Sequence, residues 1–320
     1  MITHPGVKLN LGLNVLRRRD DGYHDIETLF VPCDAFHDTL EIISGDDWSR
    51  TLGEIISGEG VPFENVGCAD PSLCKQWAPP SYVAEGGTIF KGDTLPETCA
   101  DRVRQAIRDD GKVMVTIARD EGVDWDPLKD LTVKAYEALE RDFSLPPVKI
   151  FLQKTSPVGA GLGGGSADAA FALRMLSQMF SLGLSDEALA AYASGLGSDC
   201  AFFVYNRPMI GSARGEVLEP YELDLGGFDV RVVIPEGVAV STADAYRGIV
   251  PREPDVPLRE ALSKPIEQWR ECLVNDFETT VFAKYPAIAE AKRGLYDEGA
   301  VYASMSGSGS ALFGIFKKTT

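Results

Sequence analysis

The sequence predicts an α+β fold in two domains, on three observations. The chain has 320 residues, which is long for one domain. Its composition is that of an ordinary globular protein, with 44% hydrophobic and 25% charged residues. Strand-like and helix-like segments are mixed without the strict alternation that a doubly wound parallel sheet requires.

The first half of the chain begins with strands. Alternating apolar residues predict one at 7–15, and further strands are expected at 26–34 and 38–43. Residues 45–112 are rich in Gly, Pro, Ser and Cys with weak periodicity, and we expect an irregular insertion there. The pattern then predicts a strand, a helix and a strand at 112–120, 125–143 and 148–154.

The second half mixes both element types. Helices are expected at 167–180 and 185–197, the latter with Ser185 as N-cap and acidic residues in its first turn. An apolar, strand-like run follows Asp199. Beyond it we expect a strand at 229–235, helices at 243–249, 258–263, 265–273 and 287–299, and two strands around a glycine-rich turn within 300–316.

Charge and hydropathy exclude several classes of protein. The formal net charge is −17, whereas proteins that bind nucleic acid normally have a basic surface. No run of 18 apolar residues occurs, so we expect no membrane span. The N-terminal residues lack the basic and apolar segments of a signal peptide. We therefore expect a cytoplasmic protein.

The six cysteines are expected to be reduced thiols in that compartment. A metal site among Cys68, Cys74 and Cys99 is the alternative. Their spacing differs from the usual C-x2-C pair, and no His lies nearby.

The densest signal is the stretch PVGAGLGGGSADAA, which lies between a predicted strand and a predicted helix. Free backbone N–H groups at a helix N-terminus surround phosphate readily, and the helix dipole adds positive charge there. Glycine permits the positive φ angles and close approach that such a loop needs. A glycine-rich turn that only packs against a neighbour is the structural alternative. Ser166 could cap the helix, bind a phosphate oxygen or reach Mg²⁺.

Two familiar phosphate loops do not fit. Gly159, Gly161 and Gly164 match the spacing of the dinucleotide fingerprint, but a second helix follows the first where that fold requires a strand. The Walker A pattern fails because no Gly-Lys-Ser/Thr follows the glycines.

The loop instead resembles that of the GHMP small-molecule kinases. The stretches KLNLGLNVLRRRDDGYHDIETLF, LGSDCAFF, NDFE and YASMSGSGSALFGIF are similar to the members whose acceptor is 4-diphosphocytidyl-2-C-methyl-D-erythritol. The resemblance covers residues 1–44 and 113–320. It implies a ribosomal protein S5 domain 2-like N-terminal domain at 1–224, which includes the insertion, and a ferredoxin-like C-terminal domain at 225–320, with the boundary after residue 224. It also implies transfer of phosphate from ATP, with Mg²⁺, to the acceptor's 2-hydroxyl in non-mevalonate isoprenoid biosynthesis, by a monomer or homodimer.

The resemblance also assigns catalytic residues. Asp199 corresponds to the base that receives the hydroxyl proton, although on the residues alone it is a helix cap. Lys8 corresponds to the catalytic lysine, although a lysine on a strand is ordinarily solvated. Asn10 lies two residues further along and therefore on the same strand face, near the acceptor hydroxyl.

The residues for the two substrates follow by the same resemblance. Tyr23 and His24 of the DGYH turn are expected at the face and the polar edge of the cytosine. Tyr246 is expected to supply a second aromatic ring for the stack, and Thr242 to border the same pocket. Asn275 is expected to fix local helix geometry. The nucleotide loop comprises Pro157, Gly159, Ala160, Gly161, Leu162, Gly163, Gly164, Gly165 and Ser166, the last also a candidate metal ligand.

Two departures and three alternatives remain. Ala167 stands where the family commonly has a second Ser, and Asp130 stands where it commonly has an adenine-contacting Asn. An ionised Asp cannot donate that hydrogen bond. The alternatives are a GHMP kinase with a different alcohol acceptor, a dinucleotide-binding oxidoreductase, and an inactive small-molecule sensor on the same fold.

Overall fold

The computed structural model describes residues 1–44 and 102–318. The chain forms two compact units, each assembled from several segments. The first comprises Met1–Pro5, His37–Ser156 and Asp168–Leu196, and the second comprises Gly6–Phe36, Pro157–Ala167 and Gly197–Thr320. These two units differ from the predicted domains on either side of residue 224, because the long strands near the N-terminus belong to the second unit. The linear domain division stays a prediction.

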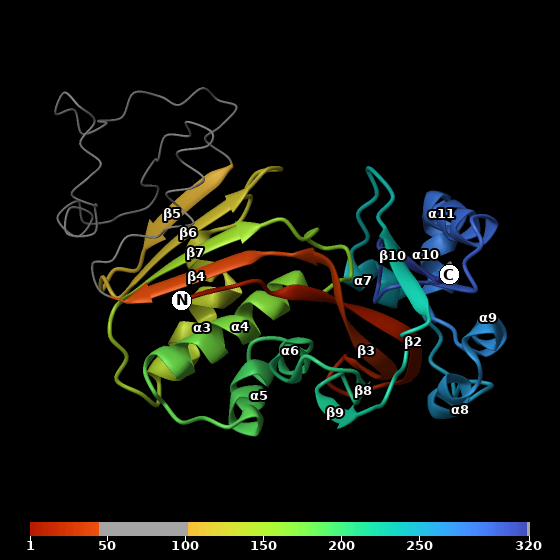
Figure 1. Cartoon of the computed structure of the whole chain (residues 1–320), viewed down its shortest axis with the longest axis horizontal. Coiled ribbons are helices and arrows are strands. Elements are labelled where there is room, and N and C mark those ends of the chain that lie inside the picture. Colours follow the sequence, from red (N-terminus) through yellow and green to blue (C-terminus); the bar gives the residue numbers. More distant parts are fainter. Residues whose placement is uncertain (45–101, 319–320) are drawn as a thin grey trace. The chain divides into compact units, whose positions relative to one another are not determined.

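The first unit is built on a sheet with strand order β1-β4-β7-β6-β5. Neighbouring strands are antiparallel except β6 and β7, which are parallel and place Val115 opposite Ile150. Figure 1 shows α3 and α4 along one side of this sheet. The elements are β1 (Ile2–Thr3), β4 (Thr39–Ser44), β5 (Val103–Ile107), β6 (Val113–Arg119), η1 (Pro127–Lys129), α3 (Leu131–Glu140), β7 (Val148–Lys154), α4 (Gly164–Met179, from the second unit into the first) and α5 (Asp186–Ser194).

Two expectations for this unit are wrong. Residues 45–112 were expected to be irregular throughout, yet β5 occupies Val103–Ile107 and pairs with β6. The helix expected at 125–143 is a short 3-10 turn followed by α3, because Asp130 caps the second helix. The Asp130 carboxylate accepts from the Thr132 amide at 2.9 Å and from Trp125 Nε1 at 3.1 Å. The predicted N-cap Ser185 is confirmed, since its side chain accepts from the Ala188 amide.

A buried polar cluster lies where β7 ends. Burial would raise the pKa of Asp38, but the charge and hydrogen bond of Lys154, with help from Ser156, outweigh it and lower that pKa. Burial raises the pKa of Asp168 well above its usual value, and the carboxylates of Asp38 and Asp130 add to this against the opposing charge of Lys154. Lys154 thus lies between two buried carboxyl groups whose pKa values are shifted in opposite directions.

The second unit contains two sheets, with strand orders β2-β3-β8-β9 and β10-β12-β11. In the second of these, β12 is the central strand and is antiparallel to both neighbours. The elements are β2 (Gly6–Arg18), β3 (His24–His37, whose last residue belongs to the first unit), α6 (Cys200–Tyr205), β8 (Met209–Ser212), β9 (Val217–Pro220), β10 (Phe228–Val233), α7 (Thr242–Arg247), α8 (Leu258–Ser263), η2 (Ile266–Gln268), α9 (Trp269–Cys272), α10 (Phe277–Lys284), α11 (Pro286–Asp297), β11 (Tyr302–Met305) and β12 (Leu312–Lys317).

Three segments of this unit were predicted wrongly or not at all. The run after Asp199 was expected to be strand-like but forms α6. Cys200–Val204 are all buried, and a segment buried on every side has no periodicity to separate helix from strand. The β8–β9 hairpin and α10 were not predicted at all. The expected helices at 243–249, 258–263 and 287–299 are present with small shifts of their ends.

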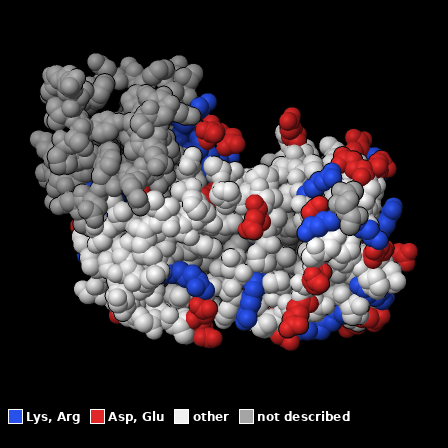
Figure 2. Space-filling model, in the orientation of Figure 1, with Lys and Arg blue, Asp and Glu red and all other residues white. Residues whose placement is uncertain are grey.

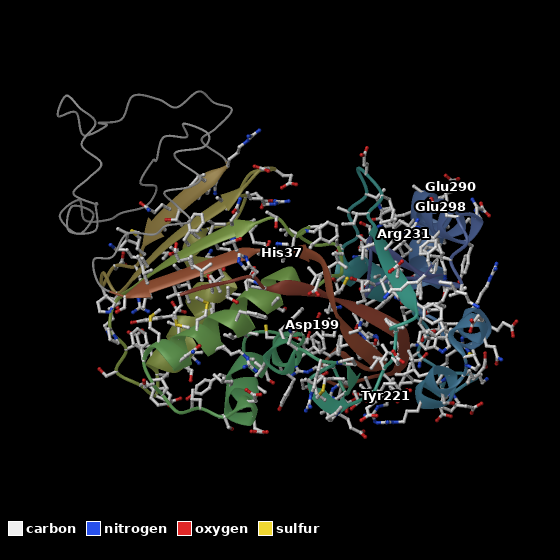
Figure 3. The ribbon with its side chains drawn as sticks, viewed as in Figure 1. His37, Asp199, Tyr221, Arg231, Glu290 and Glu298 are labelled. Carbon is white, nitrogen blue, oxygen red and sulfur yellow. The ribbon has the colours of Figure 1, made fainter. Side chains whose placement is uncertain are left out.

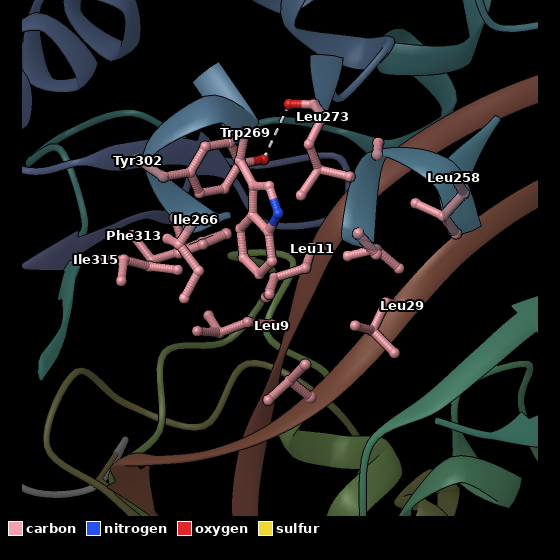
Figure 4. Close-up of a cluster of buried hydrophobic side chains, with 14 of the residues drawn as sticks. Leu9, Leu11, Leu29, Leu258, Ile266, Trp269, Leu273, Tyr302, Phe313 and Ile315 are labelled. Atoms are coloured by element: carbon pink, nitrogen blue, oxygen red, sulfur yellow. Dashed lines mark hydrogen bonds between the residues drawn. The ribbon is translucent and has the colours of Figure 1, made fainter. Parts of the chain in front are cut away.

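Strand β2 has a clear inner face. Val7, Leu9 and Leu11 pack in one apolar cluster with Leu29 of β3 and Trp269 of α9. Figure 4 shows this cluster, in which the Tyr302 hydroxyl donates to the Leu273 carbonyl at 3.1 Å. Because successive side chains of a strand point to opposite faces, this packing turns Lys8 and Asn10 to the other side.

The described surface agrees with the charge expectation. On the face shown in Figure 2, Lys and Arg lie among Asp and Glu and do not gather into one basic area. No helix in the described part of the chain is long and apolar enough to cross a membrane. Cys33 and Cys272 are free thiols, as expected, and the Cys200 thiol is buried and forms no disulfide. Cys68, Cys74 and Cys99 lie outside the described residues.

Candidate active site

Every predicted site residue from Lys8 to Tyr246 falls in the second compact unit. Lys8 is buried, so the ordinary interpretation of a solvated strand lysine is wrong. Its ammonium donates to Asn10 Oδ1 and lies 5.4 Å from the centre of the Phe30 ring. Asn10 Nδ2 in turn donates to Thr28 Oγ1 at 3.1 Å. The lysine is thus held by its strand neighbour and by β3.

Asp199 meets this lysine. Its Oδ2 lies 3.4 Å from Lys8 Nζ, and the two side chains are 27% and 4% exposed. Asp199 stands at the N-cap position of α6 (Figure 3), but its side chain makes no capping hydrogen bond. The helix-cap alternative is therefore wrong. The carboxylate is partly solvated and paired with a buried ammonium.

The glycine loop turns its carbonyl groups inward. The carbonyls of Ala160, Gly161 and Leu162 accept from the Ala311 amide at 3.1 Å, from Ser306 Oγ at 3.2 Å and from the Lys8 amide at 2.9 Å. Within the described residues, no backbone amide of residues 159–166 donates a hydrogen bond. This loop therefore offers a row of free N–H groups ahead of α4.

Alternating backbone conformation produces this arrangement. Gly159, Gly161 and Gly163 all have positive φ, at 74°, 79° and 74°. Such alternation aims successive N–H groups at one point and forms an anion-binding nest. Ala160 and Leu162, between these glycines, bury their side chains in the apolar cluster. The side chains of this loop thus anchor it, and its backbone is left for a ligand.

The second glycine-rich turn packs against the first. A Cβ on Gly307 would lie 3.0 Å from the Gly161 carbonyl and 3.4 Å from Lys8 Nζ. Asn275 holds this turn, because its Nδ2 donates to the carbonyls of Met305 and Gly307 at 2.7 and 2.9 Å. Its Oδ1 accepts from the Phe277 amide, so the expected role in local helix geometry is confirmed.

Two of the predicted base-contacting residues are stacked on each other. Tyr246 stacks directly on His24, with ring centroids 4.7 Å apart at 21°. At that distance the rings are in contact, and no base can lie between them. Tyr23 is 58% exposed, and the Arg214 guanidinium lies 5.2 Å from its ring centre. The face of Tyr23 is therefore the accessible aromatic surface of the DGYH turn.

Burial favours a neutral polar edge beside these rings. Burial and then the charge of Arg18 lower the pKa of His24. Burial, with a smaller contribution from Asp199, raises the pKa of Tyr246 to about 12. A neutral imidazole offers one donor and one acceptor. Thr242 is exposed, and its hydroxyl lies 3.1 Å from Ser308 Oγ of the second glycine-rich turn.

Ser166 is the loop residue that could reach a metal. It lies inside the first turn of α4, which begins at Gly164, so it does not take the cap position. Among the described residues, no group of three or more His, Cys, Asp or Glu could hold a metal ion. Mg²⁺ is normally bound by one or two protein oxygens plus substrate phosphates and water. The single hydroxyl therefore fits Mg²⁺ that accompanies a nucleotide.

Sequence reasoning missed several residues that complete the site. Thr28, Phe30 and Ser306 all contact Lys8 or Asn10, and Arg214 covers Tyr23. The sequence held one relevant signal: Thr28 and Phe30 are two residues apart in a predicted strand, so their side chains are expected on the same face. None existed for Arg214, whose partner lies far away in the sequence.

Comparison with known proteins identifies the family. The family model described as GHMP kinases N terminal domain matches residues 130–207, and GHMP kinases C terminal matches residues 258–320. The 4-diphosphocytidyl-2-C-methyl-D-erythritol kinase of Bacteroides fragilis is 40% identical over 316 residues, which is 99% of this chain and 92% of the relative. The chain belongs to the GHMP kinase family.

Further relatives agree with this GHMP kinase assignment. The Bacteroides thetaiotaomicron protein of the same name is 38% identical, covering 99% of this chain and 92% of the relative. A crystal structure of 4-(cytidine 5'-diphospho)-2C-methyl-D-erythritol kinase matches with a TM-score of 0.66 at 25% identity, covering 98% of this chain and 90% of that one. These alignments span nearly the whole chain, so leaving residues 45–112 outside the resemblance was wrong.

As a GHMP kinase, the chain is a small-molecule phosphotransferase with the predicted α+β fold. This excludes the dinucleotide-binding oxidoreductase. The structure agrees, because α4 is followed by α5 and not by the strand that a dinucleotide fold requires.

The GHMP kinase loop yields a matched pair of substitutions. Gly159 and Gly161 both have positive φ, but a Cβ on Gly159 meets nothing within 4 Å, whereas one on Gly161 would lie 2.3 Å from the Ser306 carbonyl. Gly159→Ala should cost about 1–2 kcal/mol of unfolding free energy from conformation alone. Gly161→Ala should cost clearly more, since the clash adds to the strain. Urea unfolding of both variants measures the difference, and equal losses would contradict the described packing.

Proposed function

We propose that this chain transfers the γ-phosphoryl group of ATP to the 2-hydroxyl of 4-diphosphocytidyl-2-C-methyl-D-erythritol, a step in non-mevalonate isoprenoid precursor biosynthesis. The observation that carries the proposal is the ion pair of Lys8 and Asp199, 3.4 Å apart, whose lysine is bonded through its backbone to the glycine loop. The 40% identical relative of that name supports the choice of acceptor. We expect the enzyme to act in the cytoplasm as a monomer or homodimer.

Phosphoryl transfer needs alignment, charge stabilisation and a destination for the hydroxyl proton. Asp199 is the proposed base. Its carboxylate is partly exposed and makes no helix-capping bond, so it is available to accept a proton from the acceptor hydroxyl. Lys8 lies close enough to stabilise the negative charge that develops as the proton leaves. Asn10 and Phe30 hold the ammonium in position.

The nucleotide would bind on the free amides of the glycine loop. Residues 159–166 present backbone N–H groups without internal partners, and the N-terminus of α4 adds the partial positive charge of its dipole. Ser166 would hold Mg²⁺ together with phosphate oxygens, and the ion would neutralise phosphate charge. Asp130 bonds to its own helix and to Trp125, so we do not assign it an adenine contact.

The cytidine end of the acceptor would contact the DGYH turn. Stacking of a base on an aromatic ring is worth about 1–3 kcal/mol, whereas an exposed cation–π contact is worth about 0.5–1 kcal/mol. A cytosine would therefore replace Arg214 on the face of Tyr23. Neutral His24, held by its stack on Tyr246, would bond the polar edge of the base, and Thr242 would border the same region.

An acceptor panel tests the function. With ATP and Mg²⁺, wild type should phosphorylate the cytidine-diphosphate acceptor and leave mevalonate, homoserine, galactose and methylerythritol 4-phosphate unchanged. Tyr23→Ala should raise the KM for the acceptor by about 5- to 150-fold, the equivalent of the stacking energy, while Tyr23→Phe keeps the ring and stays close to wild type. Turnover of a panel member that lacks cytidine, with none of the cytidylyl acceptor, would favour another GHMP kinase. No transfer to any acceptor would favour an inactive sensor.

Replacing the proposed base tests the chemistry. Asp199→Asn should lower kcat by about 10²- to 10⁴-fold, which is the usual contribution of general acid–base catalysis. The variant should still fold, because the carboxylate caps no helix and Asn keeps an oxygen that can accept from Lys8. Its unfolding midpoint should fall modestly, since the buried ammonium loses its charged partner. Asp255→Asn, a change at an exposed carboxylate, is the matched control and should leave kcat unaltered. Near-wild-type turnover by Asp199→Asn would remove Asp199 from the mechanism.

A further inference from the structure

A buried polar cluster that the transfer chemistry does not use lies in the first compact unit. It consists of Asp38 just before β4, Lys154 at the end of β7, Ser156, and Asp168 in α4. These four residues are 0%, 5%, 2% and 1% exposed. Burial of this much charge is costly, and well-packed apolar residues often replace buried ion pairs without loss of stability. Stability alone therefore does not explain why these four polar residues are buried together.

One lysine connects all members of the cluster. Lys154 Nζ donates to Asp168 Oδ2 at 2.7 Å, to Ser156 Oγ at 3.1 Å, and to Asp38. Asp38 also accepts from the amide of Ser156 at 2.8 Å and from its hydroxyl at 2.6 Å. Ser156 and Asp168 are thus tied to the same ammonium.

Ser156 and Asp168 lie at the two ends of the glycine-loop segment. Ser156 immediately precedes Pro157, and Asp168 immediately follows Ala167, so the two residues bracket the segment 157–167 that contains the glycine loop. A glycine-rich segment has many accessible conformations, and ordering it on ligand binding has an entropic cost. That cost is smaller when the two ends of the segment are already fixed. Donors that are already in place bind their ligand more tightly than donors that must be ordered on binding.

We infer that Lys154 is a positioning residue for the nucleotide, because its bonds to Ser156 and Asp168 hold the two ends of the glycine loop at a fixed separation. Asp38 completes this loop-base clamp by holding the lysine and the Ser156 backbone. The clamp rests on the proposed function, since it acts on the loop to which we assign ATP. None of its residues is one that we assign to the acceptor or to the transfer chemistry.

Separate kinetics for the two substrates test the clamp. Lys154→Met removes the three side-chain bonds, and the KM for ATP should rise by about 10- to 100-fold, since misplacement by about 1 Å costs up to about that much. The dissociation constant of ADP, measured by calorimetry, should rise in parallel. The KM for the acceptor should change less than about twofold.

A conservative pair separates positioning from simple destabilisation. Asp168→Asn keeps an oxygen that can accept from Lys154 and should retain a KM for ATP near that of wild type. Asp168→Ala removes the acceptor and should behave like Lys154→Met. The control Leu139→Ala takes volume from the buried face of α3 in the same unit and leaves the clamp intact. It should lower the unfolding midpoint without changing the KM for ATP.

The possible outcomes are distinct. Lys154→Met with a lowered midpoint but an unchanged KM for ATP would overturn the clamp, as would an equal rise in both KM values. If Lys154→Met does not fold, the comparison of Asp168→Asn with Asp168→Ala tests the clamp. Equal KM values for ATP in these two variants would overturn the proposal. Wild-type protein that neither binds ADP nor transfers phosphate would instead refute the proposed function, and the clamp with it.

Discussion

The contact between the ammonium of Lys8 and the carboxylate of Asp199, 3.4 Å apart, is the interaction on which the rest of the site depends. A buried lysine must be compensated, and here Asn10 and the ring of Phe30 contact it before any substrate arrives, while Thr28 holds Asn10. Their positions follow from two strands whose other faces are fixed by an apolar cluster. The chemistry is thus set by packing on the opposite side of β2.

The glycine loop is also fixed by its neighbours before any ligand binds, in this case through its backbone groups. Its carbonyls are occupied by Lys8, Ser306 and Ala311, its small apolar side chains are buried, and its amides remain for a ligand. Lys8 therefore contributes twice, through its side chain to the carboxylate and through its amide to the loop. The loop-base clamp of Lys154 would act on the same loop from its two ends, so one element would be constrained along its whole length.

Local patterns in the sequence were sufficient for part of this picture. The alternation of 7–15 put Lys8 and Asn10 on one face, and the glycines ahead of an amphipathic helix indicated a phosphate loop. The burial of Lys8 could not be predicted, since it depends on β3, whose Phe30 ring centre lies 5.4 Å from the ammonium. The run after Asp199 gave no periodicity because α6 is buried all round. The stack of His24 on Tyr246 depends on tertiary contacts that no local pattern encodes.

A double-mutant cycle on the central pair is the most direct test. Lys8→Met, Asp199→Asn and the combined variant would be compared by kcat/KM for the cytidylyl acceptor at saturating ATP. If the two side chains act as one unit, the combined variant should lose about as much as the more damaging single change, because residues that act together are strongly non-additive. Losses that simply multiply would mean that Lys8 and Asp199 act independently, and this account of the site would be wrong.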